Sequence, residues 1–167
     1  GNGAVTPILH SQQQHTEITE EDVKKVYAIP NELTTEYYIE VVSLLHHFEQ
    51  ATNNQQYEKE IATLQNAKQV IEKIEYEIES INEEVLDKLY PFNELSISDK
   101  DEVEAIMKRF NALSAYDQTK ILSYEDLQKS ETQINNLIRA RVIAIALGGV
   151  GVLLTVIVVK RKKKRRA

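Results

Sequence analysis

Residues 64–85, LQNAKQVIEKIEYEIESINEEV, decide the fold. From Ile71 to Val85, isoleucines and a valine recur at alternating spacings of three and four, and Leu64 lies one heptad before Ile71, while Glu, Lys and Asn fill most of the positions between them. Together these residues form one helical stripe, which consists of Leu64, Ile71, Ile74, Ile78, Ile81 and Val85. The helical pattern runs from about Gln55 to Tyr90, where Pro91 stops it. We therefore predict a helix of about 35 residues, and its stripe suits both packing within a bundle and an intermolecular coiled coil.

Two shorter amphipathic helices precede this stretch. Thr19, with Asp22 three residues later, has the pattern of a helix cap, and Pro30 stops the helix that follows. A second helix is predicted to begin at Thr34 or Thr35 and to bury one face. That face consists of Val41, Leu44, Leu45 and Phe48.

Two further helices follow Pro91. Ser98 with Asp101 is predicted to cap the first of them, and Ser123 with Asp126 the second. The side chains expected to face inward are Val103, Ile106, Met107 and Phe110 in the first helix and Leu127, Ile134 and Leu137 in the second. These helical patterns predict an all-α protein.

The chain also repeats itself at an offset of 62 or 63 residues. The matching pairs are Val41 with Val103, Leu44 with Ile106, Phe48 with Phe110, Leu64 with Leu127, and Ile71 with Ile134. We expect two helical-bundle repeats of the three-helix type that share the long helix. The predicted boundaries are a linker or disordered N-terminus over 1–18, repeats over 19–75 and 76–138, a transmembrane helix over 139–159 and a basic cytoplasmic tail over 160–167.

Residues 142–159, VIAIALGGVGVLLTVIVV, form a run without a charged residue. As a helix they extend roughly 27 Å, close to the hydrocarbon thickness of a bilayer. This run predicts a single C-terminal transmembrane helix. Its expected membrane-anchoring residues include Val142, Ile143, Leu147, Leu153 and Val159.

A basic cluster follows the apolar run and predicts its orientation. The cluster consists of Lys160, Arg161, Lys162, Lys163, Lys164, Arg165 and Arg166. Since cationic flanks stay on the cytoplasmic side, we expect the N-terminal part outside the cell and the tail inside, beside anionic lipid head groups. A tail-anchored protein with its helical bundle in the cytoplasm is the competing topology.

Small residues recur along one face of the apolar run. Ala144, Gly148, Gly151 and Thr155 follow one another at spacings of four, three and four. Such a seam allows two helices to approach closely. Homodimerisation through this face is therefore a hypothesis.

Composition narrows the chemistry. Without the seven basic residues of the tail, 13 Lys and Arg face 26 Asp and Glu, a net charge of −13, which argues against nucleic acid as a partner. The chain has no cysteine, so disulfides and thiolate metal sites are excluded. The adjacent His46 and His47 point about 100° apart on a helix and do not form a metal-binding pair, while His10 and His15 lie in the expected linker. We predict no catalytic residue, cofactor or metal.

The segment 95–134, LSISDKDEVEAIMKRFNALSAYDQTKILSYEDLQKSETQI, resembles the tandem helical repeat modules near the C-termini of Gram-positive cell-surface and secreted proteins. The residues that carry the resemblance are Lys100, Val103, Glu104, Phe110, Ala112, Leu113, Ser114, Ile121, Leu127, Glu131 and Ile134. In that family such modules are thought of as spacers beside adhesive, carbohydrate-binding or hydrolytic domains. One departure is that no LPxTG-like sorting signal precedes the apolar run.

Together these patterns predict a membrane-anchored extracellular stalk, the C-terminal part of a bacterial surface protein. One alternative is a protein-binding helical module, as an adhesin or a subunit of an envelope complex, with an unknown protein partner. Another is a tail-anchored cytoplasmic interaction domain. An enzymatic role would need a catalytic domain upstream of Gly1.

Overall fold

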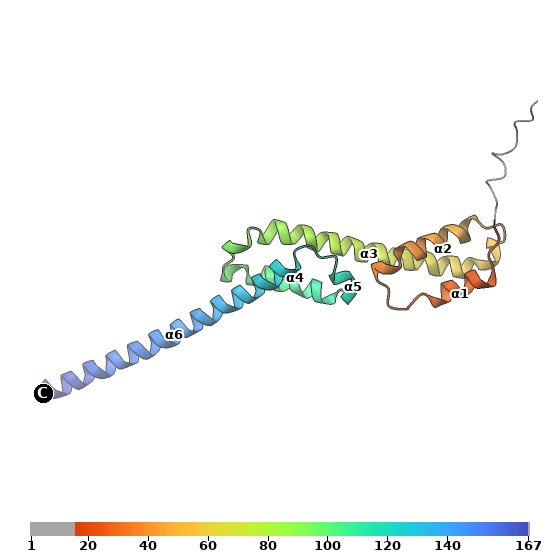
Figure 1. Ribbon diagram of the computed structural model, residues 1–167. Helices are drawn as coiled ribbons and strands as arrows, with labels where there is room; N and C mark the ends of the chain where they lie inside the picture. Colours follow the sequence, from red (N-terminus) through yellow and green to blue (C-terminus); the bar gives the residue numbers. More distant parts are fainter. Residues whose placement is uncertain (1–15, 167) are drawn as a thin grey trace, which may run out of the picture. The chain divides into compact units, whose positions relative to one another are not determined.

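The computed structural model describes residues 16–166, apart from the side chains of residues 150–159 and 161–166. This part of the chain contains helices and no strand, so the prediction of an all-α protein is confirmed (Figure 1). The α-helices are α1 (Glu20–Ala28), α2 (Tyr38–Gln50), α3 (Glu58–Leu89), α4 (Lys100–Ala112), α5 (Ala115–Gln118) and α6 (Tyr124–Arg166). Short 3-10 helices are η1 (Thr35–Tyr37), η2 (Asn54–Tyr57), η3 (Phe92–Glu94) and η4 (Ile97–Asp99).

The helices belong to two compact units. Unit 1 comprises the chain up to Glu79 together with Leu113–Lys120, and unit 2 comprises Ser80–Ala112 and the chain from Ile121 onward. Helix α3 therefore contributes its first part to unit 1 and its last part to unit 2. The domain boundaries expected from the sequence stay predictions.

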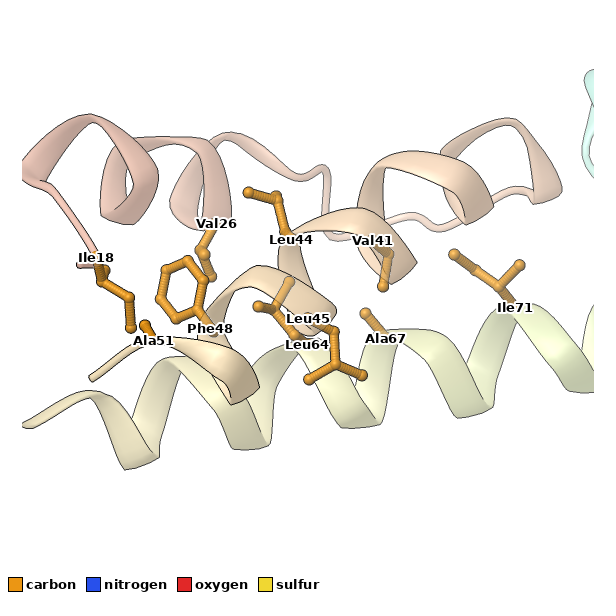
Figure 2. Close-up of a cluster of buried hydrophobic side chains, with 10 residues drawn as sticks. All are labelled: Ile18, Val26, Val41, Leu44, Leu45, Phe48, Ala51, Leu64, Ala67 and Ile71. Atoms are coloured by element: carbon orange, nitrogen blue, oxygen red, sulfur yellow. The ribbon is translucent and has the colours of Figure 1, made fainter. Parts of the chain in front are cut away.

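Unit 1 packs α1, α2 and the first part of α3 around one hydrophobic core. Figure 2 shows side chains of the three helices directed toward one another, with Phe48 of α2 between them. The core consists of Ile18, Val26, Val41, Leu44, Leu45, Phe48, Ala51, Leu64, Ala67 and Ile71. The four residues predicted to form the buried face of α2 are all among them, so this prediction is confirmed.

Local signals place the ends of the helices in unit 1. Thr19 caps α1 in a reciprocal capping box with Asp22, as predicted. The helix ends at Ala28, and Ile29 is already extended because the following Pro30 disfavours helical geometry in the residue before it. Thr34 accepts a hydrogen bond from the backbone N–H of Glu36 and begins η1, which leads directly into α2.

Unit 2 contains the last part of α3, α4 and α6. Helix α4 packs against α6, and the ring of Phe110 stacks on Tyr124 with centroids 4.9 Å apart. Buried hydrophobic residues of unit 2 are Ile81, Val85, Leu89, Leu95, Val103, Ile106, Phe110, Ile121, Leu127 and Ile134. Met107 is only half-buried.

Two details of unit 2 differ from the predictions. The capping box is formed by Ser96 and Asp99 rather than by Ser98 and Asp101, because a 3-10 turn starts the helical geometry before α4 begins. Leu137 is 38% exposed rather than inward, because α6 continues past Ile134, the last of its described side chains to be buried.

The long helix follows its predicted stripe closely. Helix α3 begins at Glu58, after η2, and ends at Leu89. Five of the six stripe residues are buried, and Ile74 is half-buried. The buried positions are Leu64, Ile71, Ile78, Ile81 and Val85.

The predicted membrane protein is not supported. Helix α6 is continuous, but in the part of the chain that the structure describes, no helix has the length and apolar character needed to cross a membrane. The expected single-pass membrane localisation, with its outward N-terminal part and cytoplasmic C-terminus, is corrected accordingly.

Only some of the expected anchoring residues have side chains that the structure describes. Val142, Ile143 and Leu147 lie on α6 and are between 58% and 67% exposed. The side chains of Leu153 and Val159 lie outside the described residues. Lys160 is exposed. The other six members of the predicted basic cluster, Arg161, Lys162, Lys163, Lys164, Arg165 and Arg166, also have side chains outside the described part.

Replacing Phe48 with Ala tests the core of unit 1. Phe48 is fully buried, so the Phe48→Ala variant should lose about 3–5 kcal/mol of unfolding free energy in urea, followed by circular dichroism. Ile39 lies on the same helix and is 78% exposed, so Ile39→Ala should change stability by less than about 0.5 kcal/mol. Equal losses in the two variants would contradict the described core.

Candidate functional site

A polar groove lies between α1 and α2 in unit 1. It has a volume of about 450 Å³ and is open to solvent. Its lining combines acidic, basic and hydroxyl groups with one apolar side chain: Asp22, Lys25, Glu40, Ser43, Leu44 and His47. Lining residues come from both helices, so the groove exists only where α1 and α2 pack together.

His47 connects the two helices at this groove. Its Nε2 lies 3.0 Å from Oδ2 of Asp22, and its Nδ1 lies 3.3 Å from the hydroxyl oxygen of Thr16. An ionised carboxylate only accepts hydrogen bonds, so Nε2 carries the proton that Asp22 accepts. In the neutral ring Nδ1 then accepts from Thr16, whereas in the charged ring it donates to Thr16.

Asp22 receives several hydrogen bonds at once. Besides His47, the backbone N–H of Thr19 donates at 2.9 Å and the Thr19 hydroxyl donates at 3.0 Å, both to Oδ2. Burial raises the pKa of the Asp22 carboxyl group, but the hydrogen bonds from Thr19 and His47 outweigh it and hold this pKa below its ordinary value. Asp22 is therefore a charged anchor for both the cap of α1 and the His47 ring.

The order hydroxyl, imidazole, carboxylate is also that of a hydrolytic triad. The groove, however, is lined by His47 and Asp22 and not by Thr16, which is exposed to solvent. A substrate held in the groove would not lie against the hydroxyl that such a triad uses as its nucleophile. The arrangement fits a clamp that fastens α1 to α2 better than it fits acyl transfer.

A second polar contact fastens α1 to α3. The phenol of Tyr27 donates a hydrogen bond of 3.0 Å to Glu60, and this bond raises the pKa of Tyr27 because it favours the protonated phenol. Helix α1 has only nine residues, so it is too short to be stable alone in water. Its attachment depends on the hydrophobic core, on Tyr27 and on the contact between Asp22 and His47, which we call the clamp.

The most buried carboxylate of the described chain was not found by sequence reasoning. Asp117 of α5 is 1% exposed, and its Oδ1 accepts from the backbone N–H of Thr35 at 3.0 Å and from the Thr35 hydroxyl at 2.6 Å. Its Oδ2 accepts from the Ser114 hydroxyl at 2.8 Å. The pattern Ser114-x-x-Asp117 signals a local cap, but nothing in the sequence indicates a contact with Thr35, 82 residues away.

Predicted site residues elsewhere have different outcomes. His46 is exposed, and His10 and His15 fall outside the described residues. Within the described part no group of three metal-ligating side chains comes together. In the predicted dimer seam, Ala144 and Gly148 lie on α6, and a side chain at Gly148 would meet nothing within 4 Å. Gly151 and Thr155 belong to the part of α6 for which only the backbone is described, so the seam stays a prediction.

No protein-family description, curated protein or solved structure matches this chain.

The clamp predicts how the unfolding free energy depends on pH. A carboxyl group whose folded-state pKa lies below its ordinary value of 3.8 stabilises the fold above that value, and this stability is lost as the pH falls through the folded-state pKa. The unfolding free energy of the unaltered chain should therefore fall more steeply between about pH 5 and pH 3 than that of Asp22→Asn. Urea titrations at each pH give both slopes.

A matched control separates this effect from general acid destabilisation. Asp87 is exposed on α3, so Asp87→Asn should keep the steep slope of the unaltered chain. At about pH 5, Asp22→Asn should also be less stable by about 1 kcal/mol, because the cap of α1 loses its charged partner. Parallel slopes for Asp22→Asn and the unaltered chain would contradict the clamp.

Proposed function

We propose that this chain is a helical spacer, a module that holds other parts of a protein or assembly at a fixed separation. The observation that carries the proposal is the sharing of α3 between two cores. Leu64, Ala67 and Ile71 lie in the core of unit 1, while Ile81, Val85 and Leu89 are buried in unit 2, all on one uninterrupted helix. A helix of 32 residues extends about 48 Å and is held by packing in both units.

A second part of the proposal is that the two units are copies of one repeat. The 3-10 turn and helix of unit 1, Thr35–Tyr37 and Tyr38–Gln50, are matched by Ile97–Asp99 and Lys100–Ala112 in unit 2, each displaced by 62 residues. Buried residues follow the same offset in three positions, Val41 with Val103, Leu44 with Ile106 and Phe48 with Phe110. Repeats that share a helix extend a protein by adding equivalent units, which is what a spacer requires.

Further support comes from the kinds of residue that are buried. The described buried positions are mostly aliphatic or aromatic, with Thr35, Asp117 and Ser130 as the polar members. Each of these three makes hydrogen bonds inside the fold, so each is accounted for by structure. The resemblance of residues 95–134 to tandem helical modules, thought of as spacers, points in the same direction.

Continuity of α3 can be tested by measuring a distance along it. The chain has no cysteine, so Thr63→Cys and Asp87→Cys place two spin labels at exposed positions of α3. The two positions are separated by 24 residues, about 36 Å along a helix. Electron–electron double resonance should give one narrow distance distribution consistent with that separation.

A matched pair of variants tests whether the helix itself sets the distance. Lys73 is exposed in the middle of α3, and Lys73→Pro removes a backbone hydrogen bond and kinks the helix, so the distribution should shift or broaden. Lys73→Ala should leave it unchanged. A broad distribution in the chain without either substitution would contradict the spacer. Narrowing on addition of a partner would then favour the alternative of a protein-binding module.

A further inference from the structure

The segment Leu113–Lys120, which we call the strap, connects the two units in an unusual way. The chain leaves unit 2 after Ala112, the end of α4, belongs to unit 1 along the strap, and returns to unit 2 at Ile121. Ile121 is 3% exposed, and the backbone N–H of the next residue, Leu122, donates at 2.9 Å to Oδ1 of Asn82 in the last part of α3. Both ends of the strap are therefore fixed within unit 2.

The middle of the strap is fixed within unit 1 by a latch that consists of Thr35, Ser114 and Asp117. Both carboxylate oxygens of Asp117 are used, Oδ1 by the backbone and hydroxyl of Thr35 and Oδ2 by Ser114. The backbone N–H of Thr35 belongs to the first turn leading into α2, where N–H groups have no partner in the helix itself. Asp117 thus caps the start of α2 from a distance of 82 residues.

The two units differ in where the carboxylate that caps the helix start comes from. In unit 2 the backbone N–H of Ser96 is satisfied locally by Asp99, at 2.8 Å. The residue 62 positions before Asp99 is Tyr37, which has no carboxylate. The helix start in unit 1 therefore lacks the acidic side chain with which unit 2 closes its own capping box. Asp117 supplies a carboxylate one residue further on, at Thr35, which follows Thr34, the residue equivalent to Ser96.

We propose that the latch couples the two units thermodynamically, so that opening of unit 2 lowers the stability of unit 1 and the reverse. When α4 or the start of α6 detaches, the ends of the strap are released, and Asp117 is no longer held at the start of α2. Loss of the latch leaves the N–H of Thr35 without its partner, which costs unit 1 stability. The same coupling free energy acts in both directions because it is an equilibrium property.

Hydrogen exchange of the full chain provides the test, with core variants as perturbations. Ile106 is 2% exposed in unit 2, and Ile106→Ala should accelerate exchange of the α2 amides in unit 1 by about tenfold or more when the latch is intact. In an Asp117→Ala background the same substitution should change α2 exchange by less than about twofold. In the opposite direction, Val41→Ala should accelerate exchange of the α4 amides only when Asp117 is present.

Two controls keep the result interpretable. Lys108 is exposed on α4, so Lys108→Ala should leave α2 exchange unchanged. If Asp117→Ala does not fold, Thr35→Ala removes only the hydroxyl contact and should reduce the coupling in part. Equal acceleration of α2 exchange with and without the latch would assign the coupling to the shared α3 and overturn the proposal, as would the absence of any effect of Ile106→Ala in the unaltered chain.

Discussion

Both cores depend on the apolar stripe of α3. Helical geometry brings residues three and four apart onto one face, so an unbroken helix presents a single stripe along its whole length. The first half of that stripe is buried in unit 1 and the second half in unit 2. A one-residue insertion between Ile71 and Ile81 would rotate one half by about 100° relative to the other. The register of α3 is thus a constraint shared by two packing problems.

The hydrophobic pattern made much of this fold predictable. Periodicity is a local property, and the predicted buried faces of α2 and of α3 were found almost unchanged. The cap of α4 was misplaced because the pattern of a hydroxyl followed by Asp occurs twice in succession, at Ser96 and at Ser98. Burial of Leu95, a tertiary event, accompanies the first of them. Composition also misled us at the apolar run, where length and charge suggested a span that no described helix supports.

The polar contacts were much less accessible from the sequence. Asp22 was identified as a capping residue, but its pairing with His47 depends on how α1 packs against α2. The contact of Asp117 with Thr35 joins segments 82 residues apart, and no periodicity connects them. Buried polar groups that are fully hydrogen-bonded select one arrangement among those that an aliphatic core permits. These contacts therefore depend on how the helices pack in three dimensions, and the spacing of residues along the sequence does not predict them.

The distant cap of α2 has a consequence for how the chain is made. During translation, α1, α2 and the first part of α3 are synthesised before Asp117 is joined to the growing chain. Until then the start of α2 has no carboxylate at Thr35, so the N-terminal core assembles first in an incomplete form. Its completion waits for the segment that follows α4, which is made after the α4 part of unit 2 and before α6. Vectorial synthesis thus delays the final form of unit 1 until the first part of unit 2, through α4, has been made.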